Sequence, residues 1–239
     1  MTNLTVAWFS AGVSSAIATK LVIDKVDEIK FINIADQHPD TLRFLKDCEK
    51  WYDKEIKIIT SPYKSVENVC LSTRYVNGPR GAACTRLLKK RPRKEWEALL
   101  DKNIKLTYIW GLDAGESHRM DRIKSAMPHH NHLFPLIDNN LDKEGAHKIL
   151  KASGIERPEM YKLGYNNNNC VGCIKGGMGY WNKIRVDFPE VFQARALMER
   201  EIGRSCIKGV FLDELDPERG RMSKEILDDC GMFCELIKI

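Results

Sequence analysis

Eight cysteines are the side chains of this 239-residue chain that could carry the most chemistry. Cys170 and Cys173 form a CxxC pair in a loop rich in asparagine and glycine, NNNNCVGCIKGG, where the backbone can wrap around a cluster. Two thiolates at this spacing supply half of a tetrahedral metal site. Since the N-terminal residues do not read as a secretory signal, the pair favours a metal or redox site over a disulfide framework.

Cys84 lies beside a run of cations that contains no acid: Arg86, Lys89, Lys90, Arg91, Arg93 and Lys94. Neighbouring positive charge lowers the pKa of a thiol, so Cys84 is predicted to favour the thiolate. The basic run itself has two interpretations that charge alone does not separate. It is either the solvated face of a helix or a landing surface for the phosphates of a nucleotide or a nucleic acid.

The remaining cysteines differ in their context. Cys230 and Cys234 lie in the C-terminal sequence DCGMFC, which suits a swinging nucleophile or a late metal ligand. Cys48 and Cys70 have no such neighbours and are predicted to be buried as small hydrophobic side chains. Cys206 is an alternative fourth ligand for a metal.

Polar residues gather where the first two predicted strands end. The turn Ser10-Ala11-Gly12-Val13-Ser14-Ser15 lacks the GK[ST] of a Walker A loop, but its small residues let backbone N–H groups approach an anion at a helix N-terminus. Asp36 and His38 follow the second strand, where ribose or adenine groups bind in folds of this kind. Ordinary turn chemistry is the alternative for both segments.

A third polar segment follows another buried strand and contains Gly111, Glu116, Ser117, Arg119 and Arg122. The two arginines are predicted to neutralise phosphate or sulfate, because a guanidinium makes paired contacts with such groups. The alternative is that Glu116 and Ser117 cap a helix and that both arginines are exposed.

The elements that position these residues alternate between strand and helix. Strands are predicted over 4–9, 29–36, 55–62 and 104–111, with helices over 16–25, 41–52 and 85–100. This alternation predicts an α/β, Rossmann-like parallel sheet flanked by helices, with ligands at the carboxyl ends of the strands. The segment PHHNH is interpreted as a polar loop leading into a strand-like HLFPLI.

The pattern changes after Pro135, where helices are predicted over 141–154 and 188–202 on either side of the CxxC loop. We therefore predict a nucleotide-binding core over 1–135 and a helical, cysteine-bearing C-terminal part over 136–239. The hydrophobic fraction of 43% is ordinary for a globular protein. No apolar run reaches the ~18 residues of a membrane span, which predicts a soluble, cytoplasmic protein.

The order of these motifs resembles the phosphoadenosine phosphosulfate (PAPS) reductases and the adenylylsulfate (APS) reductases of the PP-loop (adenine nucleotide alpha hydrolase-like) superfamily. Ser10–Ser15 stands in the position of SGGxDS, DQHPDT resembles DTGxxFPET, and CTRLLKKRP resembles the stretch after the paired cysteines of that family. Further along, three more segments match the family in the same order. FPLID resembles PLxDW, and YKLGY followed by CVGC resembles LYxxGYxxIGCxxC. DCGMF resembles the C-terminal motif ECGLH. The resemblance covers nearly the whole chain.

The resemblance implies a bound adenine nucleotide, either ATP or the sulfonucleotides PAPS and APS, and Cys230 as the reductase nucleophile. It also implies a [4Fe–4S] cluster, or zinc, held by Cys84, Cys170 and Cys173, with Cys234 or Cys230 as the fourth ligand. Several positions depart from the family pattern: Ala11 and Ser14 in the loop, Ala83 in place of a paired cysteine, and Asp113 and Ala114 in place of an arginine.

Three functions remain open at this stage. The first is a sulfonucleotide reductase, in which a thioredoxin- or glutaredoxin-like donor completes the release of sulfite. The second is an ATP-dependent enzyme that adenylates an acceptor, such as a nucleic-acid base, and inserts sulfur. The third is a module that binds nucleotide and metal without catalysis.

Overall fold

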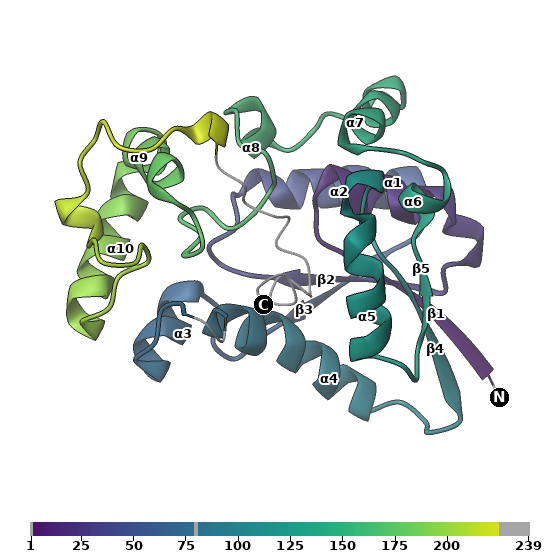
Figure 1. The fold of residues 1–239 in the computed structure, drawn as a ribbon. Helices are drawn as coiled ribbons and strands as arrows, with labels where there is room; N and C mark the ends of the chain where they lie inside the picture. Colours follow the sequence, from purple (N-terminus) through teal and green to yellow (C-terminus); the bar gives the residue numbers. More distant parts are fainter. Residues whose placement is uncertain (1, 79–80, 225–239) are drawn as a thin grey trace.

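Five parallel strands form the central sheet of the chain (Figure 1). The computed structural model describes residues 2–78 and 81–224, so Cys230 and Cys234 lie outside the described residues. The strands are β1 (Thr2–Phe9), β2 (Glu28–Asn33), β3 (Ile56–Thr60), β4 (Ile104–Ile109) and β5 (Asn131–Leu133), in the order β3-β2-β1-β4-β5. The order reverses direction between β1 and β4, and in folds of this kind ligands bind at the carboxyl ends of the strands near that point. The α/β prediction is confirmed.

Helices cover both faces of the sheet (Figure 1). One face packs against α1 (Val13–Leu21), α2 (Asp40–Tyr52), α6 (Pro135–Asp138) and α7 (Lys143–Ala152). The other face packs against α3 (Val66–Thr73), α4 (Arg91–Ala98) and α5 (Met120–Ala126). Neighbouring residues of β1 alternate between the two cores, Ala7 and Phe9 on one side and Val6 and Trp8 on the other, as the period of a strand requires.

The chain after residue 158 forms a helical cap on the edge of the sheet. It contains α8 (Glu159–Lys162), α9 (Met178–Asp187) and α10 (Pro189–Ile202), and α10 packs against both α9 and α3. The domain boundary at residue 135 stays a prediction. The helix α7, which follows this boundary, packs directly on α1 of the core. Among the described helices, none combines the length and the apolar character that a membrane span requires.

Some predicted elements differ from the observed ones. The segment HLFPLI is not one strand, because β5 ends at Leu133 and Pro135 begins a helix, a position that suits its fixed φ and its missing N–H. The predicted helix over 85–100 is two elements, a π-helix over Thr85–Lys90 and then α4, in which Pro92 has no N–H to donate backwards. The helices α3 and α9 were not predicted.

Candidate functional site

The turn between β1 and α1 is built to present backbone N–H groups. Ala11 has a left-handed φ of 59°, and Gly12 precedes the helix in an extended conformation with no side-chain cap. The first helical N–H, that of Val13, donates to the hydroxyl of Tyr161 at 3.2 Å. The N–H of Gly12 donates to Ser10 Oγ at 3.4 Å. An anion bound at this helix N-terminus would replace the hydroxyls of Ser10 and Tyr161 as the acceptor of these two donors.

Two serines brace this turn from within. The backbone N–H and the hydroxyl of Ser10 both donate to Ser15 Oγ, at 3.2 and 3.0 Å, and that hydroxyl donates to the carbonyl of Gly12 at 2.9 Å. Ser14 and Ser15 are buried in the first turn of α1. The predicted residues Ser10 to Ser15 therefore form one small, tightly bonded loop.

Gly111 closes the loop from the neighbouring strand. It follows β4, and a Cβ added there would lie 2.6 Å from Ser15 Cα and 2.8 Å from Ser15 N. The end of β4 thus approaches the backbone of α1 more closely than any side chain permits, which is a physical reason for glycine at this position.

Asp36 lies beyond the end of β2, and its carboxylate is held by protein groups. Arg195 of α10 donates to Asp36 Oδ1, and the N–H of Val66 donates to Oδ2 at 2.6 Å. His38 accepts from the N–H of Asp40 through Nδ1 at 3.2 Å. Asp36 and His38 line an open groove beside α10, and their contact with a nucleotide stays a prediction.

Arg195 was missed by the sequence analysis although it joins three parts of the site. Its guanidinium is buried and also donates to Glu67 Oε2 at 3.1 Å and to the carbonyl of Gly172, inside the CxxC turn, at 3.4 Å. Removing one partner from a buried ion pair leaves an uncompensated charge. Loss of Arg195 should therefore destabilise the contacts among Asp36, α3 and the CxxC turn. No spacing in the sequence links Arg195 to Asp36.

The segment after β4 uses its charges internally. Asp113 caps a 3-10 helix over Ala114–Arg119 in a capping box with Glu116, and the Glu116 carboxylate accepts from Arg119. Arg119 is buried, so the alternative in which both arginines are exposed is wrong for it, whereas Ser117 and Arg122 are exposed. The capping pair is Asp113 with Glu116, not Glu116 with Ser117.

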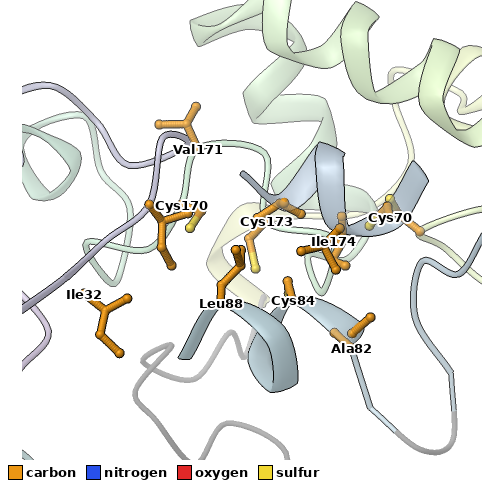
Figure 2. Packing of buried hydrophobic residues seen from close by; sticks show 14 of the residues in the cluster. Ile32, Cys70, Ala82, Cys84, Leu88, Cys170, Val171, Cys173 and Ile174 are labelled. Atoms are coloured by element: carbon orange, nitrogen blue, oxygen red, sulfur yellow. The ribbon is translucent and has the colours of Figure 1, made fainter. Parts of the chain in front are cut away.

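The structure brings Cys84, Cys170 and Cys173 to the walls of one cavity, together with Ile34, Val66, Thr85, Leu88, Lys89 and Ile174. Figure 2 shows Leu88 among the three cysteines, with Val171 on the far side of the turn. Ile34 directly follows β2, so the cavity lies at the carboxyl ends of the strands, as the turn Ser10–Ser15 does. Lys175 adds a second nearby cation, because its ammonium lies 3.4 Å from Thr85 Oγ1.

A model of the phosphoadenosine phosphosulfate reductase domain matches residues 4–176. The chain belongs to this family. The match includes the turn Ser10–Ser15 and ends directly after the CxxC pair. The PAPS reductase family is a PP-loop, nucleotide-binding family whose members are generally enzymes. No curated protein sequence matches the chain.

The CxxC turn of this PAPS reductase domain is shaped by its own packing. The Tyr180 hydroxyl accepts from the Cys173 N–H at 2.9 Å and donates to the Cys170 carbonyl at 3.2 Å. Gly172 has a φ of 69°, and a Cβ there would meet Val191 at 2.6 Å. Tyr180 and Val191 therefore constrain the geometry of the turn.

The donor set of the cavity suits a soft metal, but its arrangement does not yet form a metal site. The described residues contain no group of three or more His, Cys, Asp or Glu side chains that could hold a metal ion. Leu88 lies among the three cysteines (Figure 2). The described residues as arranged therefore do not fit a metal centre.

The other described cysteines are suited to packing. Burial raises the pKa of Cys48 and of Cys70 to about 12, which confirms them as buried hydrophobic side chains. Burial also raises the pKa of Cys206, whose N–H donates to the buried Glu199.

The basic run does not form a single surface. Arg93 is buried and pairs with Glu97, and Arg91 pairs with Glu95 at 2.6 Å, while Arg86 and Lys94 are exposed. The cations of this run therefore point in several directions, and Lys89 faces the cysteine cavity.

Proposed function

We propose that this protein binds an adenine nucleotide across the turn Ser10–Ser15 and reduces the sulfate group of a sulfonucleotide, PAPS or APS, to sulfite. The observation that carries the proposal is the meeting of the nucleotide turn and three cysteines at one edge of the sheet. Nucleotide phosphates bind at helix N-termini of this kind, and thiolates are the nucleophiles of sulfur transfer. Membership of the PAPS reductase family supports the same reaction.

In the proposed reaction, the thiolate of Cys230 attacks the sulfur of the bound sulfonucleotide. The new S–S bond forms as the bond between that sulfur and the phosphate oxygen breaks, so the nucleotide leaves and a cysteine S-sulfonate remains. One thiolate of a thioredoxin- or glutaredoxin-like dithiol then attacks the Cys230 sulfur, and a mixed disulfide forms as sulfite departs with the bonding electron pair. The second thiol of the donor attacks the donor sulfur in that mixed disulfide and releases the Cys230 thiolate. The dithiol ends as a disulfide, which balances the two-electron reduction.

A second candidate, ATP-dependent adenylation followed by sulfur insertion into a nucleic-acid base or similar acceptor, is favoured by a different observation. Asp113 stands where the resembling reductases carry an arginine, and Arg119 is paired with Glu116. Both features reduce the positive charge offered to a sulfate group after β4. ATP has no sulfate group to be bound there.

Two measurements separate the candidates. Calorimetry with ATP and with PAPS, side by side, should show tighter binding of PAPS if the first candidate is right. Sulfite release from PAPS with reduced thioredoxin should be abolished by Cys230→Ser and retained by the control Cys48→Ala, whose side chain is buried away from the edge. ATP binding without sulfite release, together with AMP or pyrophosphate formation, would favour the second candidate.

A [4Fe–4S] cluster, or zinc, held by Cys84, Cys170 and Cys173 is a separate proposal. It requires these side chains to close around the group, with Cys230 or Cys234 as a fourth ligand. Iron, sulfide and zinc analysis of protein purified without oxygen tests it. Cys84→Ser should lose the metal and Cys48→Ala should keep it. Full metal content in Cys84→Ser would contradict the shared site.

A further inference from the structure

Asn168, two residues before the CxxC pair, reaches into the nucleotide turn. Its side chain is buried, and Nδ2 donates to the carbonyl of Ala11 at 2.9 Å and to Thr41 Oγ1 at 3.2 Å. An amide nitrogen carries two hydrogens, so these two contacts use its full donor capacity. Thr41 is itself buried, in the first turn of α2. Asn168 thus joins the loops that follow β1 and β2.

The contact with Ala11 bears on anion binding through the geometry of one peptide group. The carbonyl of Ala11 and the N–H of Gly12 belong to the same planar trans peptide and point in opposite directions. Holding the carbonyl therefore fixes the direction of the Gly12 N–H, which donates to Ser10 Oγ at 3.4 Å. The contact also helps to hold Ala11 in its left-handed conformation, which is unfavourable for a residue with a side chain.

The same segment is tied to the second loop of the edge. The N–H of Val171 donates to the carbonyl of Asp36 at 2.8 Å, and Arg195 bonds both Asp36 and Gly172. The stretch from Asn168 to Cys173 is therefore bonded to the loops after β1 and β2, and it contains both cysteines of the CxxC pair. A movement of the turn and a movement of the cysteines are mechanically linked.

We propose that Asn168 is a positioning residue that couples the nucleotide turn to the CxxC segment, so that nucleotide binding at the turn slows the reaction of Cys170 and Cys173 with external reagents. This inference rests on the proposed function for the identity of the ligand. The link between the turn and the segment is a property of the protein alone and can be measured without nucleotide.

The variant Asn168→Asp tests the coupling because it keeps the shape of the side chain and replaces both donor hydrogens with an acceptor. Asn182→Asp is the control, since Asn182 Nδ2 likewise donates to two acceptors, here the carbonyls of Asp216 and Arg219 at 2.9 and 2.7 Å, on another loop. In the absence of nucleotide, hydrogen exchange at residues 11–15 and alkylation of Cys170 and Cys173 should both become faster in Asn168→Asp. Neither rate should change in Asn182→Asp.

With nucleotide, the expected loss of affinity in Asn168→Asp is at least about tenfold, the size of a lost buried hydrogen bond. Saturating PAPS or ATP should slow alkylation of the two cysteines in the wild type and leave it unchanged in the variant. Faster exchange at the turn without faster alkylation would overturn the coupling, as would equal protection in both proteins.

Wild-type protein provides a test that does not depend on the folding of a variant. Nucleotide should slow hydrogen exchange at residues 11–15 and at residues 168–173 together. Protection of the turn alone would overturn the inference and leave the proposed function standing. If neither ATP nor PAPS bound, the proposed function would fail, and the comparison without nucleotide would still decide the link.

Discussion

Replacing Gly111 with alanine should weaken nucleotide binding although Gly111 donates nothing to a ligand through a side chain. The new Cβ would lie 2.6 Å from Ser15 Cα and 3.0 Å from Ser15 Cβ. The first of these distances is about 1 Å shorter than the optimum between carbons, 3.5–4.0 Å. Because the neighbour is helix backbone, relief requires α1 and the end of β4 to separate.

Overpacking of this kind costs about 1–3 kcal/mol, which is roughly a 5- to 150-fold change in an equilibrium constant. We expect Gly111→Ala to lose both thermal stability and at least about tenfold in nucleotide affinity by calorimetry, because the N–H donors of α1 move with its backbone. Gly115→Ala is the control in the same segment, where the added Cβ meets no backbone and contacts only Asp113 Oδ1, at 3.2 Å. Affinity within twofold of the wild type in a folded Gly111→Ala protein would refute the reasoning.

Three further outcomes follow from the described contacts. Arg195→Met should lower the free energy of unfolding by about 3 kcal/mol in urea titration, because it leaves the Asp36 carboxylate buried without its cation. A decrease no larger than the one caused by replacing an exposed arginine would contradict this. Burial lowers the pKa of His132, whose Nδ1 accepts from Trp110. The free energy of unfolding should therefore fall as the pH drops below about 6.5, because the unfolded chain then binds the proton more readily than the folded protein does. The fall should be smaller in His132→Gln, and an equal fall in both proteins would show that another group causes it. Burial raises the pKa of Cys48 to about 12, so only about one thiol in ten thousand is ionised at pH 8. Iodoacetamide should therefore modify Cys48 only after the protein unfolds. Rapid labelling of the native protein would contradict this and show that the thiol is accessible.

The parts of the fold that depend on local signals could be predicted from the sequence. The apolar run 4–9, the small-residue turn and the helix after it lie next to one another, and they form β1, the loop and α1 as expected. The segment HLFPLI carries no such signal, because a short apolar run reads equally as strand or helix. In the structure the second half of this segment is helical, because Pro135 begins α6.

The parts of the site that depend on distant contacts could not be predicted. Arg195 meets Asp36 only because α10 folds back over the end of β2. Asn168 is one of four consecutive asparagines, and nothing in the sequence distinguishes the one that bonds Ala11. The meeting of Cys84 with the CxxC pair was expected only from the family resemblance, and whether these cysteines bind a metal stays a prediction.

The central claim is that an adenine nucleotide binds at the turn between β1 and α1. Hydrogen exchange of the full chain with and without saturating PAPS or ATP tests it most directly, since amides that contact a phosphate exchange more slowly. We expect the strongest protection of backbone amides from exchange at residues 12–15, with weaker protection at residues 168–173. Tight binding that protects another part of the chain and leaves residues 12–15 unchanged would contradict it.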